Sequence, residues 1–133
     1  MKVGVIIAAA GSGRRMGAEG NKVLLKIDGK PVLQHSLECF NRIDEITEVV
    51  VVTREIDLEV VQSIAEVAIP KKKIQVVIGG VERQESVHLG LNALAPDTKW
   101  VVIHDGARPF ITPEVVRKGL NAVQEHLAVG IAV

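Results

Sequence analysis

Four short apolar runs, separated by segments with helical periodicity, constrain the fold of this chain more than any other feature. The runs are rich in β-branched residues and show no polar alternation: Val3–Ala9, Glu48–Thr53, Ile74–Ile78 and Trp100–His104. Strands that helices bury on both faces have this pattern. The order of strands and helices therefore predicts an α/β fold, a Rossmann-like three-layer sandwich with a mainly parallel sheet.

The segments between these runs repeat apolar residues at helical spacing, which predicts one buried face for each helix. The four apolar stripes are Leu33, Leu37 and Phe40; Leu58, Val61 and Ala65; Val87, Leu91 and Leu94; and Val116, Leu120, Val123 and Leu127. Thr112 as N-cap and Pro113 as first helical residue predict the start of the last helix. Ile69–Pro70 predicts the end of the second.

Size and composition exclude several classes of protein. The chain has 133 residues, which suits one modest domain. Lys plus Arg and Asp plus Glu both number 16, so the chain lacks the positive charge of a general nucleic-acid or membrane-surface binder. Cys39 is the single cysteine, which excludes an internal disulfide and a cysteine zinc site. With no run near the roughly 20 apolar residues of a membrane span, we expect a cytoplasmic protein.

A glycine-rich loop after the first strand is the strongest candidate for a ligand site. Gly11, Gly13 and Gly17 allow backbone N–H groups of this loop to approach phosphate oxygens, and Arg14 and Arg15 lie within it. The segment lacks the Gly-Lys-Ser/Thr of a P-loop, and Met16 replaces the third glycine of the dinucleotide fingerprint. Two arginines favour a triphosphate ligand. The alternative is a glycine-rich turn with exposed arginines.

Three further features are candidates for the same site, and two of them directly follow strands, where ligands of open α/β sheets bind. Lys22 comes after a flexible stretch, Ala18–Asn21, and could reach over the same pocket. Asp105 is placed to hold Mg²⁺, and Arg108 to bind a second phosphate, although both also suit a structural turn. Gly79–Ser86 offers a glycine pair and a hydroxyl for a nucleobase, or is simply a loop entering a helix.

Together and in this order, these segments resemble one family closely. The matching segments are Ala9–Met16, Lys22, Gly79–Val87 and His104–Pro109. They resemble the 2-C-methyl-D-erythritol 4-phosphate cytidylyltransferases of the non-mevalonate isoprenoid pathway. The resemblance covers a little over half of a typical member. It implies that residues 1–133 are the N-terminal, CTP-binding portion of one nucleotidyltransferase domain, of the nucleotide-diphospho-sugar-transferase type and truncated on its C-terminal side.

The resemblance implies transfer of CMP from CTP to methylerythritol phosphate with Mg²⁺ as cofactor, in a complete protein that is a homodimer, while the fragment alone is inactive. It implies that Arg15 and Lys22 are catalytic and stabilise charge on the α-phosphate, that Asp105 holds the metal and that Arg108 contacts the substrate. The nucleotide-binding residues that it implies are Ala9, Ala10, Gly11, Ser12, Gly13, Arg14, Gly80 and Ser86.

The sequence departs from the family pattern at two positions, and three alternative functions are also compatible with it. Asn21 stands where the family usually has proline, so we expect a less rigid loop, and Val81 replaces the Asp or Thr of some members. The alternatives are another polyol-phosphate cytidylyltransferase, such as one for ribitol 5-phosphate, a non-catalytic CTP-binding module, and a fragment of a dinucleotide-binding oxidoreductase. A non-catalytic module has no need of cations aimed at the α-phosphate.

Overall fold

A parallel sheet with strand order β5-β4-β1-β6 organises the described part of the chain. The computed structural model describes residues 2–10, 21–108 and 111–125. The strands are β1 (Val3–Ala9), β4 (Ile46–Thr53), β5 (Lys73–Ile78) and β6 (Trp100–Asp105). All neighbouring pairs in this sheet are parallel. The predicted mainly parallel sheet is therefore confirmed, with strand limits within two residues of those expected.

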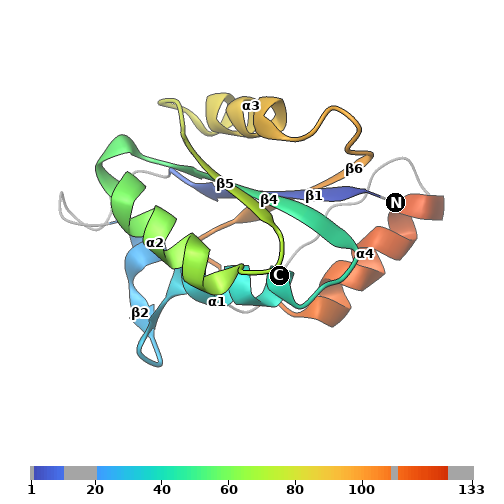
Figure 1. Cartoon of the computed structure of the whole chain (residues 1–133), viewed down its shortest axis with the longest axis horizontal. Coiled ribbons are helices and arrows are strands. Elements are labelled where there is room, and N and C mark those ends of the chain that lie inside the picture. The colour runs from blue at the N-terminus through green and yellow to red at the C-terminus, as the bar shows by residue number, and fades with distance from the viewer. Residues whose placement is uncertain (1, 11–20, 109–110, 126–133) are drawn as a thin grey trace.

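Helices cover both faces of the sheet, which confirms the predicted three layers (Figure 1). Helix α3 (Arg83–Ala93) lies on one face, and α1 (Val32–Asn41), α2 (Leu58–Ala68) and α4 (Pro113–Glu125) lie on the other. The predicted start of α4 is confirmed, because the Thr112 hydroxyl accepts a hydrogen bond from the Val115 N–H at 3.3 Å.

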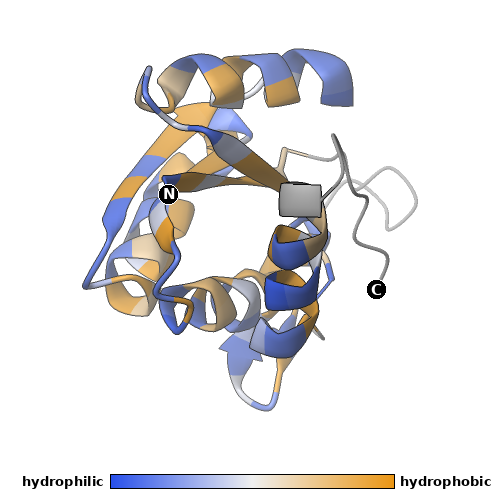
Figure 2. Cartoon of the chain, turned by 90° about the vertical axis from the view of Figure 1, so that its right-hand side faces the viewer, coloured by the Kyte–Doolittle hydropathy of each residue, from blue (hydrophilic) through white to orange (hydrophobic). Residues whose placement is uncertain are grey.

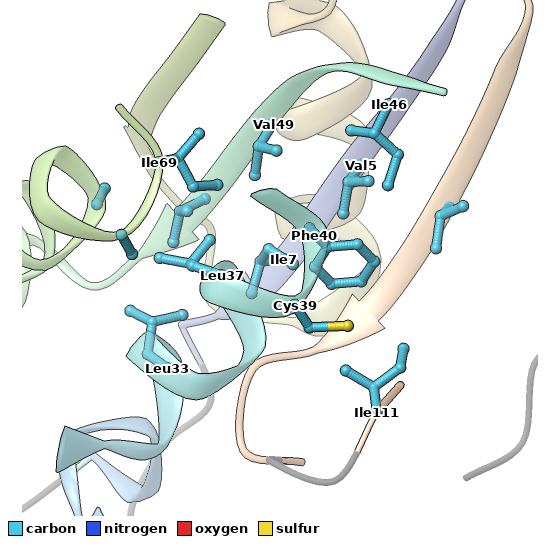
Figure 3. Packing of buried hydrophobic residues seen from close by; sticks show 14 of the residues in the cluster. Val5, Ile7, Leu33, Leu37, Cys39, Phe40, Ile46, Val49, Ile69 and Ile111 are labelled. Atoms are coloured by element: carbon cyan, nitrogen blue, oxygen red, sulfur yellow. The ribbon is translucent and has the colours of Figure 1, made fainter. Parts of the chain in front are cut away.

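The larger core lies between the sheet and helices α1, α2 and α4. Alternate residues of β1, from Val3 to Ala9, point into it, and the predicted stripe of α1 packs on them with Leu33, Leu37 and Phe40 fully buried (Figure 3). Apolar residues accordingly concentrate on the strands and on the inner sides of the helices (Figure 2). Cys39 is buried in this core, and burial raises the pKa of its thiol.

The face that α3 presents to the sheet differs from the predicted stripe. Ser86, Gly90 and Leu94 are buried, whereas Leu91 is 42% exposed, so the expectation that Leu91 faces the core is wrong. The reason is steric: a Cβ added to Gly90 would lie 2.8 Å from the Ile6 side chain. The small residues let α3 approach the sheet closely, and this contact fixes the rotation of the helix.

Two smaller features complete the described fold. A short hairpin, β2 (Lys26–Ile27) and β3 (Lys30–Pro31), turns through two residues with positive φ, Asp28 and Gly29. The Pro70–Lys73 stretch is expected from its sequence to be a solvated turn, but the Lys72 ammonium donates to the carbonyls of Ile43 and Ile46. None of the described helices is both long and apolar enough to cross a membrane.

Candidate functional site

The described segments that follow β1, β5 and β6 meet at the carboxyl edge of the sheet. Ala8, near the end of β1, pairs with Asp105 at the end of β6. On the other side, Gly79 follows β5 and its N–H donates to the Thr53 carbonyl at 2.8 Å. Because β1 lies between β4 and β6, three segments from distant parts of the chain converge around its last residues.

A pocket of about 230 Å³ opens at this edge, beside β1. Its lining residues are Ala8, Ala10, Gly80, Val81, Glu82, Arg83 and Ser86. Three residues expected to bind nucleotide, Ala10, Gly80 and Ser86, are thus brought together. A fourth, Ala9, does not line the pocket, because its side chain is buried in the larger core.

The glycine pair after β5 is explained by packing within the chain. A Cβ on Gly79 would lie 2.5 Å from the Ser86 hydroxyl oxygen and 3.0 Å from the Ala10 Cβ. A Cβ on Gly80 would collide with the Glu85 side chain. The pair therefore lets the first turn of α3 fold back over the strand end, and this contact places Ser86 in the wall of the pocket.

Asp105 begins a tight turn in which backbone groups fix its carboxylate. Its Oδ1 accepts a hydrogen bond from the Ala107 N–H at 3.0 Å, and its Oδ2 lies 4.0 Å from Nε of Arg108. The Gly106 N–H donates to the Ala8 carbonyl at 2.9 Å, which attaches the turn to β1. The predicted structural pairing of Asp105 with Arg108 is therefore present, and both side chains are also about half exposed.

His104 and Ser36 anchor the far end of this turn. The His104 Nε2 lies 3.1 Å from the Arg108 carbonyl oxygen, to which the Ser36 hydroxyl also donates at 3.0 Å. The ring of Phe40 meets the His104 ring edge-on at 5.4 Å. From its place at the end of an apolar run, His104 is expected to be a packed strand-end residue rather than a base, and it is indeed only 5% exposed. Its burial lowers the pKa of the imidazole.

Lys22 lies in a short turn that packs beside the Asp105 turn. It opens the 3₁₀ turn η2 (Lys22–Leu24), with its own side chain exposed while Asn21 and Val23 on either side are buried. A Cβ added to Gly106 would lie 3.2 Å from a Val23 methyl group, so the two turns are in contact. Contact between these two turns therefore fixes the backbone of Lys22 relative to that of Asp105.

Five of the expected site residues lie outside the described residues: Gly11, Ser12, Gly13, Arg14 and Arg15. Ala18–Gly20 lie there too, but Asn21 contradicts the expected flexibility of its stretch. Asn21 is only 3% exposed, and its side chain makes three hydrogen bonds.

The donor set fits a magnesium ion that is shared with a phosphate ligand. Among the described residues, no group of three or more His, Cys, Asp or Glu side chains could form a complete metal cage. Asp105 instead offers one carboxylate, with Oδ1 held by the backbone. Mg²⁺ is commonly held by one or two carboxylates together with waters and substrate phosphates, so a single fixed carboxylate suits it.

Residues to which no role was assigned from the sequence also line or support the site. Ala8, Glu82 and Arg83 line the pocket, and Glu82 and Arg83 already belong to the matching segment Gly79–Val87. Arg54 and Asp57 support the base of the Lys22 turn from the segment after β4. No local motif marks these two residues, because they meet Asn21 only through the fold.

A comparison with models of protein families identifies the family of this chain. The model of the 2-C-methyl-D-erythritol 4-phosphate cytidylyltransferase family matches residues 3–133. The chain belongs to this family. The resemblance drawn from the motifs is thereby confirmed across nearly the whole sequence.

Individual cytidylyltransferases show the same likeness. The 2-C-methyl-D-erythritol 4-phosphate cytidylyltransferase of Clostridium botulinum (strain Langeland) is 39% identical over 132 residues, which cover 99% of this chain and 58% of that protein. The enzyme of the same name from Alkaliphilus metalliredigens is 42% identical over 133 residues, or 99% of this chain and 55% of its own length. The crystal structure of 4-diphosphocytidyl-2C-methyl-D-erythritol synthase from Anaerococcus prevotii superposes with a TM-score of 0.80 at 35% identity.

That superposition covers 92% of this chain and 51% of the Anaerococcus protein. The chain therefore spans about half the length of the cytidylyltransferases that it matches. The half that it spans contains the carboxyl edge of the sheet, the pocket beside β1 and the turns of Lys22 and Asp105.

Proposed function

We propose that this chain forms the CTP-binding part of a cytidylyltransferase that transfers CMP from CTP to 2-C-methyl-D-erythritol 4-phosphate and releases pyrophosphate. The family match over residues 3–133 carries the proposal. The convergence of Ala10, Gly80 and Ser86 in one pocket supports it, because these residues come from two of the matching segments.

In this proposal the pocket beside β1 receives the nucleoside. The pocket has a volume of about 230 Å³, and Gly80 and Ser86 are among its lining residues, so a backbone amide and a hydroxyl are available there. Hydrogen bonds from such fixed groups select a base by the positions of its donors and acceptors. The triphosphate would then extend along the carboxyl edge toward Lys22 and Asp105.

The chemistry is an in-line attack of a substrate phosphate oxygen on the α-phosphorus of CTP. Negative charge grows on the equatorial phosphate oxygens, and fixed cations stabilise it electrostatically. We assign this role to Lys22 and Arg15. Asp105 would hold Mg²⁺, which neutralises charge on the phosphates, and Arg108 would contact the acceptor phosphate. The complete protein is proposed to be a homodimer in the cytoplasm.

Calorimetric titration of this chain with CTP, UTP, ATP and GTP in the presence of Mg²⁺ tests the nucleotide half. Selective binding of CTP is the expected result. Equal binding of all four nucleotides, or none, by a chain shown to be folded would contradict the assignment of the pocket.

The acceptor is tested in the complete gene product by following pyrophosphate release. We expect release with CTP and methylerythritol phosphate, and little with ribitol 5-phosphate. The reverse preference would identify the alternative polyol-phosphate enzyme.

The Lys22→Gln substitution separates an enzyme from a CTP-binding module. An enzyme should lose kcat by about 100-fold or more with CTP affinity largely kept. CTP binding with no turnover in the unsubstituted protein would favour the non-catalytic module.

A further inference from the structure

A buried hydrogen-bond network lies directly behind the proposed catalytic lysine. Its three members are Asn21, Asp57 and Arg54. Asn21 is 3% exposed and Asp57 is 8% exposed, so both side chains are almost completely removed from water. Buried polar groups of this kind are costly unless their hydrogen bonds are satisfied, and a satisfied network fixes its members rigidly.

The Asn21 side chain uses three of its bonding positions. Its Nδ2 donates to the Ala9 carbonyl at 2.7 Å and to Oδ2 of Asp57 at 3.1 Å. Its Oδ1 accepts from the Val23 N–H at 3.3 Å. One side chain thus joins the last residue of β1 to the turn that contains Lys22.

Asp57 and Arg54 complete the network from the other side. Asp57 lies at the end of η3 (Glu55–Asp57), just after β4, and its Oδ2 also accepts from Nε of Arg54 at 2.8 Å. The guanidinium compensates the buried carboxylate, so Asp57 can accept from Asn21 without leaving an isolated charge in the interior. The network therefore ties the ends of two neighbouring strands to the Lys22 turn.

We propose that Asn21 and the Arg54–Asp57 pair are positioning residues for Lys22. This inference rests on the proposed function, in which the Lys22 ammonium acts on the α-phosphate. Lys22 itself is exposed, while Asn21 and Val23 on either side are buried. The network fixes the backbone from which the long lysine side chain extends, and so limits where its ammonium can go.

Fixing this backbone matters because catalysis by a charged group depends on its placement. A displacement of about 1 Å at a reacting group can cost roughly 100-fold in rate. Asn21 is expected from the sequence to make the loop before Lys22 less rigid than proline would. Its three hydrogen bonds instead hold this part of the backbone in place. Asp57 contributes to this placement indirectly, because it accepts a hydrogen bond from Asn21, the residue directly before Lys22.

The first test is kinetic and uses the complete gene product. Asn21→Leu removes the three hydrogen bonds while keeping the branched arrangement of side-chain heavy atoms, and we expect kcat to fall about 10- to 100-fold while KM for CTP stays unchanged. Gln75→Leu is the matched control, since it removes a part-buried amide that donates to the Ala93 carbonyl at 3.1 Å, away from the site. The control should leave kcat unchanged.

The decisive comparison repeats Asn21→Leu in the Lys22→Gln background. If Asn21 acts through Lys22, it should cause no further loss of kcat there, because the group that it positions is gone. A loss of the same size in both backgrounds would show a general structural effect and overturn the proposal. Arg54→Gln and Arg117→Gln form a second matched pair, since each breaks an arginine–carboxylate contact but only Arg54 belongs to the network.

A second measurement, amide hydrogen exchange in this chain, does not depend on activity. Asn21→Leu should speed the exchange of the Val23 N–H, which Asn21 holds, and Gln75→Leu should not. Unchanged exchange at Val23 would overturn the proposal whatever the kinetics show. If exchange at Val23 becomes faster but the unsubstituted protein has no cytidylyltransferase activity, Asn21 does hold the Lys22 turn and only the proposed function is contradicted.

Discussion

At the scale of single residues, the two carboxylate oxygens of Asp105 have different surroundings, and only one of them is used by the backbone. Oδ1 is engaged by the Ala107 N–H, and Oδ2 faces the half-exposed Arg108 side chain. Asp105→Asn keeps an oxygen for the backbone and removes the charge that would hold Mg²⁺. We therefore expect the strengthening of CTP binding by Mg²⁺ to fall by roughly tenfold, or about 1.4 kcal/mol.

Titrations with CTP at increasing Mg²⁺ measure this effect directly. Asp44→Asn is the control, because Asp44 is an exposed carboxylate in a loop away from the carboxyl edge. If the Mg²⁺ dependence survives Asp105→Asn unchanged, Asp105 is not the metal ligand.

At the scale of elements, the contact between α3 and the sheet depends on one glycine. A Cβ at Gly90 would lie 2.8 Å from Ile6 and 3.2 Å from Val52, and both of these side chains are fully buried. Overpacking of this kind costs about 1–3 kcal/mol. Alanine regains about 1 kcal/mol of helix propensity. We expect Gly90→Ala to destabilise the fold by about 1 kcal/mol.

Urea unfolding measures that change, with Asn92→Ala as the control in the same helix. Asn92 is exposed, so alanine there should stabilise slightly through helix propensity alone. Opposite signs for the two substitutions would support the close contact of α3. A stabilising Gly90→Ala would show that the helix can move away from the sheet without cost.

The sequence predicted the elements well where a local pattern decides them. The apolar runs located all four strands of the parallel sheet, and Thr112 with Pro113 located the start of α4. The prediction was wrong for Leu91 because the rotation of α3 depends on how closely Gly90 approaches Ile6, which is a property of packing. The hairpin was not predicted although Asp28–Gly29 is a typical turn sequence.

For the site, the sequence predicted the segments and the fold supplied their connections. Ala10, Gly80 and Ser86 meet in one pocket as expected from strand ends. The support behind Lys22 could not be predicted, because Asn21 and Asp57 are 36 residues apart and meet only once β1 and β4 are paired. Asn21 also shows why a residue near glycines need not be flexible: its own hydrogen bonds hold it.

At the scale of the whole molecule, the carboxyl edge and the larger core are coupled through His104. This side chain is 5% exposed, packs on Phe40 in the core and lies within hydrogen-bond distance of the turn that follows Asp105. Burial lowers the pKa of its imidazole below the ordinary value of about 6.5. Protonation of His104 is therefore less favourable in the folded state than in the unfolded chain.

This coupling predicts how stability changes with pH. Between the lowered pKa of folded His104 and the ordinary value near 6.5, the unfolded chain binds more protons than the folded one. The free energy of unfolding should therefore be constant near pH 8 and fall as the pH drops below about 6.5, by at most about 1.4 kcal/mol per pH unit. Urea unfolding at several pH values between 5 and 8 measures this dependence. His104→Gln should remove most of the slope, whereas His88→Gln, at an exposed position on α3, should leave it intact. An unchanged slope in His104→Gln would show that another group controls the acid sensitivity.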